Sequence, residues 1–304
     1  MSELRTLLIG YKVTDLNNHM LEGDTTVHTL DIYHCHSIHK VFKRDRVVCT
    51  PHLPEGPWDL IKFKTGPKLM SGELTLDLFQ EIVKTGAKWE LEYVGKERDK
   101  NELIDKVTKN FRERSFKATW QASVPGGKPL TFVSYPGCFC HRRQDEGGLA
   151  LAEVVSRELN DGHVEVERGR KVLDMGCGCG LVGLLINSVC PIDLTCVDSH
   201  TRAIEACEEN IRAQGANARA ILSDNGIDEL GAYDIFVGNP PYYSDYRIAE
   251  VFLETAKKCL KPGGVCYQVV KNADGLKPVQ EKYFPQVEVI KRRGYAVLKS
   301  IQNN

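Results

Sequence analysis

A glycine-rich turn within residues 171–183 constrains the fold more than any other feature of this sequence. The chain passes there from a short apolar run into the turn and then into an apolar stretch of helical character. Val172 and Leu173 predict the end of a buried strand. Three glycines alternate with other residues through the turn: Gly176, Gly178 and Gly180. Because glycine has no Cβ atom, the backbone can approach a ligand closely, so we expect a nucleotide-type ligand at the carboxyl end of this strand.

The spacing of these glycines separates two classes of cofactor. A dinucleotide-binding turn has the pattern Gly-x-Gly-x-x-Gly, which would require glycine where Leu181 stands. The observed pattern is Gly-x-Gly-x-Gly preceded by Asp174. This form resembles the first motif of class I methyltransferases that depend on S-adenosyl-L-methionine. Asp174 is therefore counted among the predicted cofactor-binding residues. A structural strand-to-helix turn without a ligand is the alternative.

Acidic residues at the ends of the next two predicted strands support the same cofactor. Asp198 ends the second strand about 20 residues beyond the turn, a position from which a carboxylate accepts hydrogen bonds from ribose hydroxyls. Ser199 follows it as the predicted N-cap of a helix. The next strand, 218–222, leads to Asp224 and Asn225, where Asp224 can accept from an adenine amino group. Acidic strand ends also arise as turns or helix caps, so that interpretation stays open.

A proline-rich motif follows the fourth predicted strand and carries the predicted chemistry. It consists of Asn239, Pro240, Pro241 and Tyr242. Two prolines remove two backbone donors and stiffen the loop. The Asn239 side-chain oxygen and the Pro240 carbonyl can accept the two N–H groups of a planar amine while Tyr242 stacks on its ring. No strong base is needed, because these acceptors stabilise the developing ammonium until it loses its proton.

Length, composition and charge limit the class of protein. A chain of 304 residues with 42% hydrophobic and 27% charged residues is typical of a soluble protein with two domains. No apolar stretch approaches the roughly 20 residues of a membrane helix, and the first residues lack the layout of a secretory signal. Eleven cysteines, several within apolar runs, fit a reducing compartment. We therefore expect a cytoplasmic protein without membrane contact.

A net charge of −1 gives no overall attraction to nucleic acid, so an RNA-binding face has to be local. Four basic clusters are candidates, although each is also compatible with an ordinary solvated surface. They are Lys40, Lys43, Arg44 and Arg46; Arg112, Arg114 and Lys117; His141, Arg142 and Arg143; and Lys291, Arg292 and Arg293.

The alternation of strand and helix patterns predicts an α/β protein with two domains. Strands are expected at 58–63 and 89–94 and helices around 78–86 and 100–111, without a glycine-rich turn, so the first domain should not bind the cofactor. The Pro- and Gly-rich turn 124–129 marks a loop between two short strands near the boundary. The predicted domains are 1–122 and 123–304, and the second ends in a helix (248–259), a strand (265–270) and a closing hairpin (287–290 with 295–298).

Clusters of Cys and His residues do not follow the spacing of zinc sites. Four potential ligands fall within six residues: His34, Cys35, His36 and His39. Neighbouring residues of a strand point to opposite faces, and no second pair follows at zinc-site spacing, so a polar strand or loop is predicted there. The pairs Cys138-x-Cys140 and Cys177-x-Cys179 are separated by one residue instead of the usual two to four. We expect no metal site.

Residues 130–304 resemble the methyltransferase small domain family, which includes ribosomal RNA methyltransferases. Four stretches carry the resemblance: 136–147, 172–180, 239–241 and 295–299. The N-terminal half is similar more faintly, through Asp59-Leu60-Ile61, Pro67-Lys68 and Gly95-Lys96-Glu97. The resemblance implies a Rossmann-like C-terminal domain with a seven-stranded mixed sheet. It also implies a smaller, degenerate methyltransferase-like first domain that has lost its cofactor site and supports the fold or presents RNA.

The resemblance also implies roles for the motif residues. S-Adenosyl-L-methionine would contact Gly176, Gly178, Gly180, Asp198 and Asn225, and Asn239 with Pro240 would receive the target amine. The implied reaction is methylation of an exocyclic amino group in RNA, namely guanine N2 of ribosomal RNA, free or in a ribosomal particle, by a monomer. The family usually has Phe and then His after the two prolines, whereas Tyr242 and Tyr243 stand here.

Two other functions remain open on the sequence. Asn-Pro-Pro-Tyr is shared with enzymes that methylate adenine N6 or a glutamine side-chain amide in protein. A non-catalytic RNA-binding or assembly factor built on a methyltransferase fold is the alternative from a different class.

Overall fold

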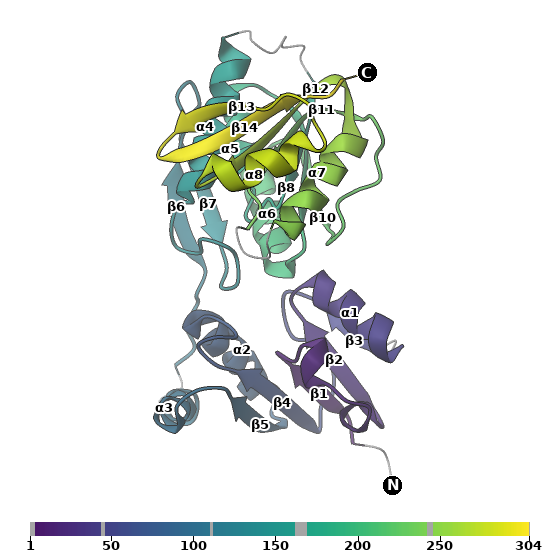
Figure 1. Ribbon diagram of the computed structural model, residues 1–304. Helices are drawn as coiled ribbons and strands as arrows, with labels where there is room; N and C mark the ends of the chain where they lie inside the picture. The colour runs from purple at the N-terminus through teal and green to yellow at the C-terminus, as the bar shows by residue number, and fades with distance from the viewer. Residues whose placement is uncertain (1–3, 44–45, 110–111, 162–168, 242–245, 304) are drawn as a thin grey trace. The chain divides into compact units, whose positions relative to one another are not determined.

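The computed structural model describes residues 4–43, 46–109, 112–161, 169–241 and 246–303 (Figure 1). Its chain divides into two units. The first contains residues 1–117 with 135–137 and 200–202, and the second contains residues 118–134, 138–199 and 203–304. The division therefore falls between 117 and 118, a few residues before the predicted one, because the strand 118–122 pairs with the strand 130–134 of the second unit.

The first unit contains a five-stranded parallel sheet with the order β3-β2-β1-β4-β5. Its strands are β1 (Thr6–Ile9), β2 (Thr25–Thr29), β3 (Val47–Cys49), β4 (Leu60–Thr65) and β5 (Lys88–Tyr93). Its helices are α1 (Ile32–Phe42), α2 (Gly72–Lys84) and α3 (Glu97–Thr108), with short 3₁₀ turns η1 (Val13–Asp15) and η2 (His19–Leu21). The predicted α/β class is confirmed for this half of the chain.

Helix α2 closes one face of this sheet. The Ser71 side chain accepts a hydrogen bond from the Leu74 backbone N–H at 3.2 Å and so caps the helix. Leu78 and Phe79 recur at helical spacing and are buried, and the Phe79 ring meets Phe63 of β4 edge to face at 5.7 Å. Apolar periodicity therefore sufficed to predict this helix.

The cluster of His and Cys residues lies in helix α1, so the predicted polar strand or loop was wrong. This applies to His34, Cys35, His36 and His39. The Asp31 side chain caps the helix by accepting from the Tyr33 N–H at 2.9 Å. Only Ile38 is fully buried on α1, so the helix offers almost no apolar stripe from which its period can be recognised.

Protein atoms pack closely against the turn after β1. Gly10 has φ +79°, and a Cβ atom at this position would lie 2.1 Å from the Lys64 carbonyl oxygen of β4. Tyr11 beside it is buried, and Lys64 Nζ lies 5.7 Å from the centre of its ring. The neighbouring strand β4 therefore leaves no room for a side chain at position 10.

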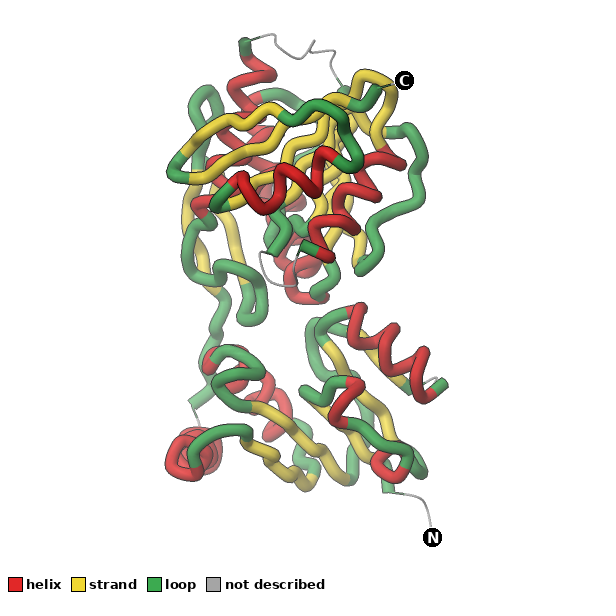
Figure 2. The backbone as a smooth tube through the Cα atoms, in the orientation of Figure 1, coloured by secondary structure: helices red, strands yellow, loops and turns green. Residues whose placement is uncertain are grey.

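The second unit contains a seven-stranded mixed sheet with the order β10-β9-β8-β11-β12-β14-β13 (Figures 1 and 2). Its strands are β8 (Lys171–Met175), β9 (Asp193–Asp198), β10 (Ala218–Leu222), β11 (Tyr233–Gly238), β12 (Leu260–Val270), β13 (Glu288–Arg292) and β14 (Tyr295–Ile301). Its helices are α4 (Glu146–Asn160), α5 (Leu181–Val189), α6 (Thr201–Gln214), α7 (Arg247–Cys259) and α8 (Ala273–Glu281), and β6 (Ala118–Ala122) pairs with β7 (Leu130–Ser134) as a separate hairpin.

Strand directions confirm the predicted mixed sheet. The five strands from β10 to β12 are parallel, and β14 runs antiparallel to both β12 and β13. Central strands are buried on both faces, as Leu173 of β8 and Phe236 of β11 show with 0% exposure. In the part of the chain that the structure describes, none of the helices combines the length and the apolar character needed to span a membrane.

Two local details differ from the sequence interpretation. Helix α6 begins at Thr201, so His200, and not Ser199, precedes its first residue. Helix α8 was not predicted; it contains Pro278 and is capped by Asn272, which accepts from the Asp274 N–H at 3.2 Å. A proline within a short polar segment hides the helical pattern from sequence analysis.

A buried carboxylate on α4 binds two strands of the sheet through a hydrogen bond and an ion pair. Glu158 is 7% exposed, and the Tyr267 hydroxyl of β12 donates to it at 3.1 Å. The ammonium group of Lys299, on β14, contacts the same carboxylate oxygen. One acidic side chain on the helix therefore holds two neighbouring strands.

We predict that Lys299→Met lowers the free energy of unfolding by about 3 kcal/mol, because it leaves the Glu158 carboxylate buried without a counter-charge. Chemical denaturation at neutral pH measures the change. Lys291→Met, at an exposed position of β13, is the control and should stay close to the wild type. Adding Glu158→Gln to Lys299→Met should restore most of the loss; a loss that persists would show that the charge is not its cause.

Candidate active site

The two predicted motifs begin at the same edge of the second sheet. Strands β8 and β11 are parallel neighbours, and Met175 lies opposite Gly238 in their register. The glycine-rich turn starts directly after Met175, and Asn239 directly follows Gly238. The structure therefore places the glycine-rich turn and Asn239 at the ends of neighbouring strands.

The three glycines of the turn serve different purposes. Gly176 and Gly180 have φ of 71° and 84° and face protein: added Cβ atoms would lie 2.8 Å from Phe252 Cζ and 2.9 Å from Cys207 Sγ, respectively. Gly178 has φ of 54°, and among the described residues, its two chain neighbours apart, none has an atom within 4 Å of the position of a Cβ. Of the three glycines, Gly178 is therefore the one at which a ligand finds open space beside the backbone.

Asp198 joins the turn to the neighbouring strand. Its Oδ2 atom accepts a hydrogen bond from the Gly178 N–H at 2.9 Å, and its carbonyl oxygen accepts from the Ser223 N–H at 2.9 Å. Ser199 follows it and is half-buried. The structure thus places the predicted ribose-binding carboxylate directly beside the open glycine.

Asp224 and Asn225 lie in a turn at the end of β10, on the far side of β9 from the glycine-rich turn. The Ser223 hydroxyl accepts from the Asn225 N–H at 3.3 Å and donates to the Gly226 carbonyl at 2.7 Å. Asp224 is half-buried and Asn225 is exposed. This turn shares the carboxyl edge of the sheet with the other candidate residues, since Leu222 lies opposite Asp198.

Asp174 lies beneath the turn. It is 2% exposed, and its Oδ2 atom accepts from the Gly183 N–H of α5 at 2.9 Å. Burial in the protein interior raises the pKa of this carboxyl to about 7. Asp174 thereby fixes the start of α5 behind the turn, and its direct contact with a cofactor stays a prediction.

Asn239 is oriented by Asp145, a residue that the sequence analysis missed. The Asn239 side-chain nitrogen donates to Asp145 Oδ2. The same carboxylate caps α4, because it accepts from the Gly147 N–H at 3.1 Å and the Gly148 N–H at 2.9 Å. Since a carboxylate only accepts, the amide oxygen of Asn239 is turned away from Asp145 and is available as an acceptor. Burial, the largest influence, raises the pKa of Asp145.

Gly147 leaves room for an aromatic ring close to this amide. A Cβ atom at Gly147 would lie 3.3 Å from Tyr295 Cε1 and 3.6 Å from Asn239 Oδ1. The Lys271 ammonium group lies 4.2 Å from the centre of the Tyr295 ring. Tyr295 therefore adds a half-buried aromatic side chain close to Asn239. It opens the stretch 295–299 that carries part of the family resemblance, but the sequence analysis gave it no role in the site.

The two prolines continue the loop after Asn239. Pro240 is buried and Pro241 is half-buried. Tyr242, predicted to stack on the substrate ring, lies outside the described residues. Its role and that of the proline carbonyls stay predictions.

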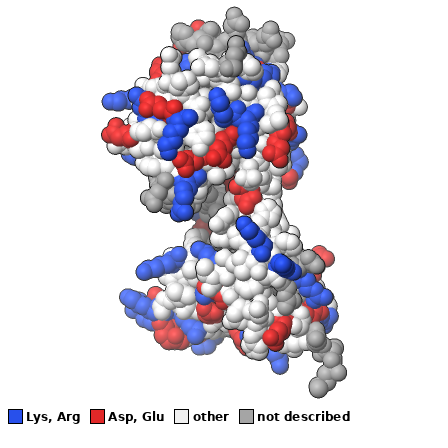
Figure 3. Space-filling view, turned by 45° about the vertical axis from the view of Figure 1, so that its right-hand side comes forward, with Lys and Arg blue, Asp and Glu red and all other residues white. Residues whose placement is uncertain are grey.

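Two of the three basic residues in the cluster Lys291, Arg292 and Arg293 are held in ion pairs. Arg292 and Arg293 both contact Glu153 of α4, and Arg293 also contacts Glu146. On the face shown in Figure 3, basic and acidic side chains are interspersed. RNA that binds to that face would therefore contact individual basic side chains, because the face carries no continuous positive potential.

Comparison with known proteins gives a family and a fold. Residues 129–299, more than half of the chain, match the methyltransferase small domain family. Ribosomal RNA small subunit methyltransferase C of Marinomonas sp. is 29% identical over 257 residues, which are 81% of this chain and 69% of that protein. The protein of the same name from Shewanella loihica is 34% identical over 155 residues, 49% of this chain and 42% of that protein.

A solved structure resembles nearly the whole chain. The T. thermophilus 16S rRNA N2 methyltransferase, in complex with AdoMet and guanosine, superposes with a TM-score of 0.82 at 19% identity, covering 98% of this chain and 88% of that one. This likeness confirms the predicted fold of a methyltransferase domain preceded by a second α/β unit.

We predict that Asp174 makes stability depend on pH. Its carboxyl has an ordinary pKa of 3.8 when the chain is unfolded and about 7 when it is folded, so the folded state holds the proton more tightly. Asp174 makes its whole contribution to the free energy of unfolding below about pH 4. This contribution is lost as the pH rises through 7, and the total loss is roughly 4 kcal/mol. Denaturation between pH 4 and 8 measures the slope.

Asp174→Asn should flatten this slope, because the amide oxygen can still accept from Gly183 but carries no proton. Asp193→Asn, at the start of β9, is the matched control and should keep the wild-type slope. An unchanged slope in Asp174→Asn would contradict the prediction.

Proposed function

Because the chain belongs to the methyltransferase small domain family, we propose that it transfers a methyl group from S-adenosyl-L-methionine to guanine N2 of ribosomal RNA. The observation that carries the proposal is the Asn239 amide, oriented by Asp145 at the strand end beside the glycine-rich turn. We further propose a cytoplasmic monomer that acts on the RNA alone or within a ribosomal particle.

The residues of the turn fit a nucleoside with a sulfonium tail. Gly178 leaves open space where a side chain would block a ligand, and the Asp198 carboxylate beside it suits ribose hydroxyls. The proposed binding set also includes Asp174, Gly176, Gly180, Ser199, Asp224, Asn225 and Asn239. When bound, S-adenosyl-L-methionine supplies an electrophilic methyl group.

The chain's own contribution to the reaction is to bind and orient the amine. The oxygen of Asn239 and the carbonyl of Pro240 would accept its two N–H groups, which directs the nitrogen lone pair away from the loop. Pro240 and Pro241 keep this loop stiff. Acceptors of this kind stabilise positive charge that develops on the nitrogen, and the proton leaves afterwards. Holding the two reactants in line supplies roughly 7 to 11 kcal/mol of the barrier.

Guanine in ribosomal RNA is favoured over other amines by the relatives. The proteins from Marinomonas and Shewanella are named ribosomal RNA methyltransferases, and the T. thermophilus structure holds guanosine. Tyr295 offers a ring surface near Asn239 that suits a flat base. Asn-Pro-Pro-Tyr is also used on adenine N6 and on glutamine amides, so these acceptors are the competing outcomes.

The test is incubation of the protein with methyl-labelled S-adenosyl-L-methionine and ribosomal RNA from cells that lack this protein, offered free and as small-subunit particles. Nucleoside analysis should find the label in N2-methylguanosine. Label in N6-methyladenosine or in protein would overturn the proposed acceptor. Absence of cofactor binding by calorimetry would instead identify a non-catalytic RNA-binding factor.

We predict that Asn239→Ala abolishes methyl transfer and leaves the affinity for S-adenosyl-L-methionine nearly intact, because it removes an acceptor for the amine and not the glycine-rich turn. Single-turnover transfer and calorimetry measure the two quantities. Asn187→Ala, on α5 away from the proposed amine site, is the control. It should keep both methyl transfer and cofactor affinity. Retained turnover in Asn239→Ala would refute the assigned role.

We predict that Asp145→Ser lowers kcat by roughly 100-fold, as expected when a reacting group loses its alignment. Serine still caps a helix, so stability should change little, but its shorter side chain no longer reaches Asn239. The KM for RNA and the affinity for the cofactor should stay near wild type. Glu146→Gln, at the next position, is the matched control. A fall in stability with unchanged kcat would leave Asp145 only a structural role.

A further inference from the structure

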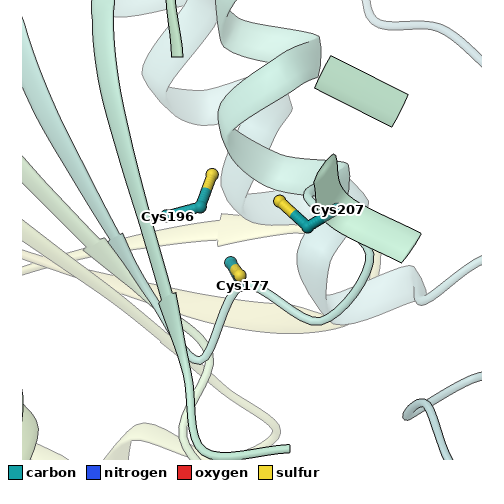
Figure 4. Close-up of side chains that lie close together, drawn as sticks. All are labelled: Cys177, Cys196 and Cys207. Atoms are coloured by element: carbon teal, nitrogen blue, oxygen red, sulfur yellow. The ribbon is translucent and has the colours of Figure 1, made fainter. Parts of the chain in front are cut away.

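Three cysteines from separate segments meet behind the glycine-rich turn. Cys177 lies in the turn, Cys196 on β9 and Cys207 on α6 (Figure 4). Their sulfur atoms all lie within 4.8 Å of one another, and the residues are 5%, 0% and 0% exposed. The sequence analysis considered only cysteines paired within a single segment, so this group was not found.

The three side chains come from a turn, a strand and a helix, so their sulfurs meet only in the folded chain. A thiolate is the form of cysteine that binds metal, so the three thiols would lose their protons on binding.

We propose that Cys177, Cys196 and Cys207 form a binding site for one monovalent copper ion. Metal–sulfur bonds of about 2.3 Å place the sulfurs of a trigonal site roughly 4 Å apart, so the observed spacing needs only a small contraction. Sulfur ligands select soft ions over Mg²⁺ and Ca²⁺. Structural zinc takes four ligands, whereas this group, in the described part of the chain, offers three.

Binding would act on the cofactor turn through Cys177. Its N–H donates to the Val197 carbonyl of β9 at 3.0 Å, and its carbonyl accepts from the Gly180 N–H at 2.9 Å. Its S–H group lies 3.5 Å from the Gly178 carbonyl. An ion bound by all three cysteines would link the turn to β9 and α6. It would therefore restrict the motion of the turn that contains Gly178. Binding also replaces the thiol protons, so it releases protons to solvent.

The test is a titration of the reduced, metal-free full-length protein under anaerobic conditions, with Cu⁺ in one arm and Zn²⁺ in the other, each against a chromophoric chelator. The wild type should retain one equivalent of Cu⁺ through gel filtration and bind Zn²⁺ more weakly. X-ray absorption should find three sulfur neighbours. Cys207→Ala and Cys177→Ala should lose this retention, and Cys266→Ala, an equally buried cysteine of β12, should keep it.

Hydrogen exchange supplies a readout that does not depend on methyl transfer. Cu⁺ should slow exchange of the Gly178 and Gly180 amides in the wild type and in Cys266→Ala, and leave it unchanged in the variants of the cluster. If Cys207→Ala does not fold, Cys177→Ala in the turn gives the same comparison. Retention of Cu⁺ by the cluster variants, no retention by the wild type, or tighter binding of Zn²⁺ would overturn the proposal.

Discussion

The parallel pairing of β8 with β11 is the interaction on which the rest of the site depends. With Met175 opposite Gly238, both strands end at the same level, so the glycine-rich turn and Asn239 leave the sheet side by side. A shift of one residue would turn every side chain of a strand to the opposite face. Close packing on both faces of the central strands keeps the register fixed, because a shift would move buried side chains out of the spaces that they fill.

The sequence alone was sufficient to predict a motif where the backbone requires one residue type that few others can replace. The glycine-rich turn and the Asn-Pro-Pro motif were recognised because positive φ angles and missing backbone donors demand Gly and Pro. The seven-stranded sheet followed from apolar runs and the family resemblance. Helix α1 was missed because its composition is polar, and α8 because it contains Pro278.

Contacts between distant segments could not be predicted from the sequence. Asp145 and Asn239 are 94 positions apart, and no spacing rule joins them. Two signals were available: an acidic residue directly before the apolar stripe of α4, which indicates a helix cap, and the place of Asp145 within the stretch 136–147 that carries the family resemblance. Neither indicates Asn239 as its second partner. The same is true of Tyr295 and of the three cysteines, whose proximity arises only when turn, strand and helix have packed.

The glycine directly after the central strand has the same steric role in both units. Strand order β3-β2-β1-β4-β5 repeats the order of the parallel strands β10-β9-β8-β11-β12, so the chain carries one topology twice. Gly10 follows β1 as Gly176 follows β8, and protein atoms lie against both: the Lys64 carbonyl at Gly10 and the Phe252 ring at Gly176. A side chain is therefore excluded at the same point of both copies, and any substitution there would have to displace a neighbouring strand in one copy and a neighbouring helix in the other.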